Sequence, residues 1–189
     1  MSADHAPPAD HSQTTPLDIA PLDIACAMAH GEIAAPAGDR KLVAIFASPV
    51  ALQLAHLAAH VGYQVVVLDP DAQRELASAP LVRQLRETGC DQNTDVVVTD
   101  HDRPELGDVL AEVLAASTRW VGVMGSPRHT APHVQALRER RVPDEQIARV
   151  HRPIGLDIGS RSPAEIAVAT VAGLLADRAG RSGGQYARS

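Results

Sequence analysis

Short apolar segments alternate with stretches of helical periodicity between residues 41 and 141. The apolar segments are rich in Val and Ile on both sides of the alternation, and they cover residues 41–47, 64–68, 95–99 and 120–124. Such segments are typical of parallel strands that helices cover on both faces. The helical periods cover residues 49–61, 80–88, 105–117 and 132–141. This order predicts a doubly wound, mainly parallel α/β sheet with helices on both faces, the Rossmann-like arrangement.

The C-terminal part predicts one further helix, which begins with a capping box. Ser162 is the cap, Pro163 takes the first helical position and Glu165 stands three residues after the cap. Residues 166–175 contain no charged side chain, whereas a surface helix normally has a polar stripe. We therefore expect the sheet to cover one side of this helix and a second copy of the chain to cover the other, which predicts a homo-oligomer through residues 163–178.

The 189 residues suffice for one domain of ordinary size, which the pattern places at residues 39–180. Residues 1–38 contain five acids and no Lys or Arg, and we expect a flexible acidic arm with one short helix near residues 23–32. Residues 181–189 are expected to form a flexible tail. The start lacks the charge of a signal peptide, and no apolar stretch reaches the roughly 18 residues of a membrane span. A cytoplasmic protein is therefore expected.

Composition disfavours nucleic-acid binding. The chain has four aromatic residues and a formal net charge of −6, whereas nucleic-acid binding depends on clustered cations and on aromatic stacking. Cys26 and Cys90 lie far apart, and we read both as free thiols rather than a disulfide or a metal pair.

Two histidine pairs have the four-residue spacing of a helical metal face. Pro132 interrupts the first pair, His129 and His133, and no carboxylate or cysteine completes a ligand set. The second pair, His56 and His60, is read as the solvated face of the first helix. No metal site is predicted.

Ligands of an open parallel sheet bind beyond the carboxyl ends of its strands. A dinucleotide site would place glycines in the first of these turns, but the chain contains no GxGxxG motif. Ser48 can cap the following helix and contact a ligand, whereas the side chains of Phe46 and Ala47 are expected to crowd the phosphate position. NAD(P) is therefore the less favoured cofactor.

The second and third strands end in acidic turns. Asp69 stands where an acid binds the ribose in dinucleotide enzymes, although Asp-Pro is also a common turn opening. His101 follows the third strand between Asp100 and Asp102. Because imidazole changes charge near neutral pH, His101 is a candidate general acid or a ligand of an anionic cofactor; a hydrogen-bonded turn is the alternative.

The fourth strand ends in a glycine turn. Gly122, Gly125 and Ser126 can form an anion-binding nest of backbone amides, and Arg128 adds a positive charge. This turn is the strongest candidate for a phosphate or pterin contact, with tight packing as the alternative.

Residues 154–167, which read IGLDIGSRSPAEIA, closely resemble the C-terminal signature of the XdhC/CoxI family, the accessory proteins of xanthine dehydrogenase and carbon monoxide dehydrogenase. WVGVMGSPR at residues 120–128 is similar to the fourth strand and glycine turn of that family. VVVTDHD at residues 96–102 and LDP at residues 68–70 match its third and second strands more loosely. The resemblance spans about residues 41–178.

The resemblance implies binding of the molybdenum cofactor (molybdopterin), help in its sulfuration and delivery to a molybdenum hydroxylase. In the signature, Gly155 and Gly159 bracket Asp157 and suit a loop with unusual backbone angles. Arg161 could pair with Asp157 or with a phosphate. A structural loop that ties the last helix to the sheet is the alternative.

The chain also departs from the family pattern. The glycine-rich first turn is replaced by residues 46–48, and we expect the family's N-terminal domain to be absent and to be supplied by a separate accessory protein. The other expected partners are molybdenum hydroxylase subunits.

Three functions remain open. The first is a cofactor-handling protein that acts by binding and is not an enzyme by itself. The second is an NAD(P)-dependent oxidoreductase with an altered dinucleotide site. The third is a protein-interaction module without a small ligand.

Overall fold

The computed structural model describes residues 26–31, 38–76, 79–125 and 131–184. The chain divides into two units, Met1–Ala37 and Gly38–Ser189. In the first unit, residues 26–29 form a helical turn within the range predicted as a helix, and the turn ends at Gly31, which has a φ of 73°. Residues 1–25 and 32–37 of the predicted flexible arm and the tail beyond residue 184 lie outside the described residues.

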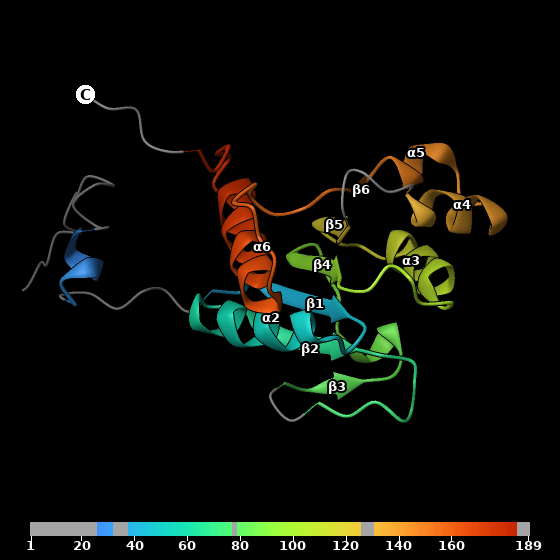
Figure 1. Ribbon diagram of the computed structural model, residues 1–189, viewed down its shortest axis with the longest axis horizontal. Helices are drawn as coiled ribbons and strands as arrows, with labels where there is room; N and C mark the ends of the chain where they lie inside the picture. Colours follow the sequence, from blue (N-terminus) through green and yellow to red (C-terminus); the bar gives the residue numbers. More distant parts are fainter. Residues whose placement is uncertain (1–25, 32–37, 77–78, 126–130, 185–189) are drawn as a thin grey trace, which may run out of the picture. The chain divides into compact units, whose positions relative to one another are not determined.

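The second unit is built on a six-stranded sheet of order β3-β2-β1-β4-β5-β6 (Figure 1). The strands are β1 (Lys41–Ile45), β2 (Gln64–Leu68), β3 (Leu81–Val82), β4 (Thr94–Val98), β5 (Trp120–Val123) and β6 (Val150–His151). Neighbouring strands are parallel throughout. The strand order is that of the Rossmann fold, with its reversal between β1 and β4. The predicted doubly wound architecture is confirmed.

Helices cover both faces of the sheet, as the apolar strands require. On one face, α2 (Pro49–His60) and α6 (Pro163–Arg178) pack over Leu42 and Ala44 of β1. The other face carries α3 (Leu106–Ala115), α4 (Pro132–Glu139) and α5 (Asp144–Ile147). Val43 and Ile45 point to that second face, because successive strand residues alternate between faces.

Residues 80–88 do not form the predicted helix. They form the edge strand β3 and the 3-10 turn η1 (Leu85–Glu87). The Pro80 carbonyl accepts the Val67 N–H at 2.8 Å, and the Val82 carbonyl accepts the Asp69 N–H at 3.0 Å. The edge therefore supplies partners that β2 would otherwise lack. Elements as short as β6 and α5 carry too little periodicity to be predicted.

The last helix has the predicted capping box. Ser162 Oγ accepts the Glu165 N–H at 3.3 Å, and the Glu165 carboxylate accepts the Ser162 N–H at 3.0 Å. α6 packs against α2 on one side. On another side it meets the loop after β6, whose Leu156 N–H donates to the Ala169 carbonyl at 3.1 Å. The side of α6 for which we expected a second copy of the chain is thus covered in part by this loop of the same chain. The homo-oligomer stays a prediction.

A buried carboxylate, Asp95, joins the sheet to α6 at the amino ends of the strands. It is fully buried and accepts hydrogen bonds from the Tyr63 hydroxyl at 3.0 Å, from Arg178 at 2.8 Å and from Arg119. Arg119 also pairs with Asp177 of α6. A buried charge is tolerated when it is paired in this way, and loss of one partner is costly. The position of α6 therefore depends on this acid.

The pKa of Tyr63 gives a test of this network. Burial and the neighbouring Asp95 carboxylate raise the pKa of Tyr63 from 10.0 to about 12. The folded state therefore holds this proton more tightly, so the stabilisation is complete below pH 10 and is lost as the pH rises towards 12. Between pH 9 and pH 12, we expect the wild type to lose about 2 kcal/mol more stability in urea unfolding than Tyr63→Phe. Parallel stability curves for the two proteins would contradict this assignment.

Candidate functional site

An open cleft of about 840 Å³ lies beyond the carboxyl ends of β4, β5 and β6. Its lining comes from the turns after these strands and from the start of α2 and α6: Val50, Thr99, His101, Met124, Gly125, residues 153–161, Ile166 and Ala169. Open parallel sheets bind their ligands at this edge. The volume lies in the range of roughly 300–1,000 Å³ found for small-molecule sites.

The loop of residues 153–161 is held against α6 by its backbone. Gly155 has a φ of 84°, and a Cβ on this residue would lie 3.1 Å from the Ala169 carbonyl carbon. Across the contact, a Cβ on Gly173 would lie 3.1 Å from the Gly155 Cα. Gly159 also has a positive φ, of 71°, but a Cβ there would meet nothing within 4 Å. Gly155 therefore serves close packing, and Gly159 leaves open space at the cleft.

Three ionisable side chains line the cleft, those of His101, Asp157 and Arg161. Asp157 and Arg161 are exposed, and neither forms an ion pair among the described residues. The predicted pairing between them is therefore not formed. The Arg161 backbone N–H donates to the Glu165 carboxylate at 2.7 Å, which fixes the end of the loop. His101 Nε2 lies 3.7 Å from the Asp102 carboxylate, and its side chain is 25% exposed. A carboxylate, a guanidinium and an imidazole are thus available to a ligand.

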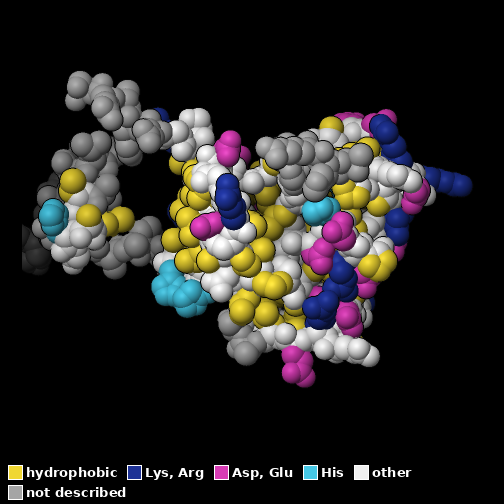
Figure 2. Space-filling view, viewed as in Figure 1, with side chains coloured by type: hydrophobic (Ala, Val, Ile, Leu, Met, Phe, Trp, Pro, Cys, Tyr) yellow, Lys and Arg dark blue, Asp and Glu magenta, His cyan; other side chains and the backbone are white. Residues whose placement is uncertain are grey.

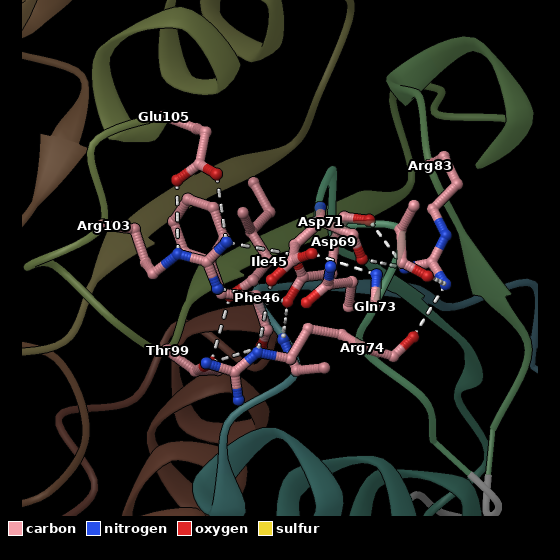
Figure 3. A network of polar contacts seen from close by, with 12 residues as sticks. Ile45, Phe46, Asp69, Asp71, Gln73, Arg74, Arg83, Thr99, Arg103 and Glu105 are labelled. Carbon is pink, nitrogen blue, oxygen red and sulfur yellow. Dashed lines mark hydrogen bonds and ion pairs between the residues drawn. The ribbon is translucent and has the colours of Figure 1, made fainter.

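In the turn after β1, Phe46 has the left-handed backbone conformation that glycine usually adopts. Phe46 has a φ of 70°, and its ring is 1% exposed. The Arg103 guanidinium carbon lies 4.9 Å from the ring centroid, and the two side chains overlap in Figure 3. The expectation that Phe46 crowds the phosphate position is therefore wrong, because its side chain packs into the core.

Hydrogen bonds nevertheless bridge the crevice between β1 and β4. Ser48 Oγ donates to Thr99 Oγ1 at 2.8 Å and accepts the Ala51 N–H at 3.1 Å. Thr99 Oγ1 in turn donates to the Phe46 carbonyl at 2.8 Å. Pro49, the first residue of α2, has no N–H. In dinucleotide enzymes the backbone N–H groups at this helix start bind pyrophosphate. Here Pro49 offers no N–H group, and the Ser48 hydroxyl and the Ala51 N–H are already hydrogen-bonded within the protein.

Asp69 is buried in the same network (Figure 3). Its carboxylate accepts the Ala47 N–H at 2.8 Å, the Asp71 N–H at 3.0 Å and the Arg103 guanidinium at 3.3 and 3.4 Å. Arg103 also pairs with Glu105 at 3.1 Å. The predicted ribose contact of Asp69 would require these bonds to break. Sequence reasoning missed Arg103, although strand ends that share one edge could have placed it beside Asp69.

The glycine turn after β5 is only partly described. Gly122 does not line the cleft, and a Cβ on it would lie 2.2 Å from the Trp120 ring, so its role is packing. Gly125 does line the cleft. Ser126 and Arg128, the other members of the predicted anion nest, lie outside the described residues.

The described ranges contain neither a metal cluster nor a membrane helix. They hold no group of three or more His, Cys, Asp or Glu side chains that could bind a metal ion. Nor does any helix there have the length and apolar character needed to cross a membrane. Cys26 and Cys90 are free thiols, and burial raises the pKa of the Cys90 thiol.

Comparison with known proteins gives consistent matches. The family model described as the XdhC Rossmann domain matches residues 42–174. The uncharacterized protein YqeB of Escherichia coli (strain K12) is 33% identical over 89 residues, which cover 47% of this chain and 16% of YqeB. A probable xanthine dehydrogenase subunit of Bacillus subtilis (strain 168) is 26% identical over 149 residues, which cover 73% of this chain and 43% of that protein.

A solved structure shows the same similarity. The crystal structure described as a xanthine dehydrogenase from Bacillus halodurans matches with a TM-score of 0.60 and 25% identity. The match covers 77% of this chain and 45% of the other. This chain therefore spans less than half the length of each of these relatives.

The two loop glycines form a matched pair for a stability test. Gly155→Ala adds the cost of a left-handed residue, about 1–2 kcal/mol, and that of overpacking against α6, about 1–3 kcal/mol. Gly159→Ala adds only the first of these costs. We expect urea unfolding to show a clearly larger loss of stability for Gly155→Ala. Equal losses would mean that the close contact between the loop and α6 is wrong.

Proposed function

The chain belongs to the XdhC Rossmann domain family, and on that premise we propose that it acts by binding in the maturation of a molybdenum hydroxylase of the xanthine dehydrogenase type. Its ligand is the molybdenum cofactor, and its binding site is the cleft at β4, β5 and β6. The observation that carries the proposal is that residues 153–161 line this cleft. The names of two relatives, which mention xanthine dehydrogenase, support the same role.

The polar groups of the cleft fit the chemistry of molybdopterin. A pterin presents N–H donors along its amino-pyrimidinone edge, and a carboxylate such as Asp157 can accept two of them. The phosphate of molybdopterin suits a guanidinium such as Arg161, which binds phosphate through paired donors. Neither side chain is held in an ion pair within the described chain. The bound group would supply the sulfur ligands that carry molybdenum.

The remaining lining residues support binding rather than catalysis. His101 offers a further hydrogen bond, and the open space at Gly159 lets a flat ring approach the backbone. The contacts around the first turn weigh against the NAD(P)-dependent alternative. There Asp69 is buried and fully hydrogen-bonded, and Ser48 bonds to Thr99.

The partners of this function are also proposed. Molybdenum hydroxylase subunits would receive the cofactor from this chain. A separate accessory protein is the second proposed partner.

A binding assay with molybdopterin tests the proposal. At about a hundred times the dissociation constant, molybdopterin should stabilise the fold by about 2.7 kcal/mol, which raises the melting temperature measurably. Arg161→Gln and Asp157→Asn should each weaken binding by about tenfold or more, because each removes a hydrogen bond to a charged group. Matched controls are Arg138→Gln and Asp144→Asn, an exposed ion pair that does not line the cleft.

Three outcomes would contradict the proposal. A response to NAD or NADP without one to molybdopterin would favour the oxidoreductase. No response to any of these ligands would favour the interaction module. Equal weakening by the cleft variants and by the controls would place the ligand elsewhere.

A further inference from the structure

Two histidines lie together at the C-terminal end of α2. His56 and His60 are both exposed, and their ring centroids are 4.7 Å apart. They are one helical turn apart and therefore share one face of the helix. Figure 2 shows histidine side chains gathered at this end of α2. The arrangement brings two imidazoles within reach of one small ligand.

The hydrogen bond of His60 fixes which ring nitrogen is free. His60 Nδ1 lies 2.8 Å from the backbone carbonyl oxygen of His56. A carbonyl oxygen can only accept, so Nδ1 carries the proton and the lone pair of the neutral ring lies on Nε2. Metal-binding histidines use the same arrangement, in which the second ring nitrogen donates to a carbonyl. In His60, therefore, Nε2 is the nitrogen whose lone pair is available to a metal ion.

The distance between the rings suits a shared ion. Imidazole nitrogens bind zinc at about 2.0–2.1 Å, so two nitrogens on one ion lie roughly 3 Å apart. Because ring nitrogens lie outside the centroids, centroids 4.7 Å apart allow two nitrogens to reach this separation once the exposed rings turn towards one ion. The last carbonyls of a helix also favour a nearby cation, and His60 is the last residue of α2. The net charge of −6 acts in the same direction.

We propose that His56 and His60 form a surface site for a divalent transition-metal ion, of the class of Zn²⁺, Ni²⁺ and Cu²⁺. Imidazole favours these ions over Mg²⁺ and Ca²⁺, which prefer oxygen ligands. The site has two protein ligands among the described residues, and water completes the coordination. It lies outside the lining of the cleft and does not depend on the proposed function.

Titration of the tag-free full chain with NiCl₂, followed by calorimetry, tests this site. The wild type should show a binding event that is absent with MgCl₂. His56→Gln and His60→Gln should each weaken this event by about tenfold or more, because each removes one arm of a chelate. The double variant should lose no more than either single variant, since one ion needs both rings. His151→Gln, which removes another exposed imidazole, should leave the event unchanged.

The proposal fails if the double variant binds Ni²⁺ as tightly as the wild type. It also fails if the two single effects add, because additivity means two independent, one-ligand contacts. Paramagnetic broadening gives an independent readout: Ni²⁺ should broaden the ring resonances of His56 and His60 together and before those of His151. Unchanged melting temperatures without metal would show that the variants are folded.

Discussion

The buried carboxylate of Asp69 is the contact on which the ligand-binding edge of the sheet depends. It accepts hydrogen bonds from the turn after β1, from its own turn after β2 and from Arg103, which follows β4. A buried charge without such partners would be costly, so the three chain segments are held together. Arg103 at the same time covers the ring of Phe46. The turns at the reversal of strand order are thereby bonded to one another within the protein.

The cleft lies next to this crevice, beyond the ends of β4, β5 and β6, and Val50 and Thr99 line it on the side of the crevice. Its loop rests on α6 through the contact between Gly155 and Gly173. α6 in turn is held at the amino ends of the strands, where Arg178 donates a hydrogen bond to Asp95. The geometry of the cleft thus depends on two buried acids, one at each end of the strands.

The sequence predicted the elements whose pattern is long enough to read. Central strands, the helices over them and the capping box at Ser162 depend on local periodicity and local hydrogen bonds, and these are present in the structure. The helix predicted at residues 80–88 is wrong because the backbone of β2 needed an edge partner, a need that no local pattern reveals.

Contacts between residues distant in sequence were harder to predict, because no local pattern reveals them. Asp69 and Arg103 are 34 residues apart, and Tyr63 and Arg178 are 115 apart. The positive φ of Phe46 could not be predicted from the sequence either, since a non-glycine residue rarely adopts that conformation. By contrast, the unusual string at residues 154–167 led directly to the loop that lines the cleft.

Hydrogen exchange with bound molybdopterin tests most directly whether the ligand site lies beside the crevice rather than in it. We expect slower exchange of backbone amides at residues 155–161 and 99–101, which line or adjoin the cleft, with no change at residues 46–48. Protection concentrated at residues 46–48 would instead place the ligand in the ordinary dinucleotide position, between β1 and β4, and would contradict this location of the site.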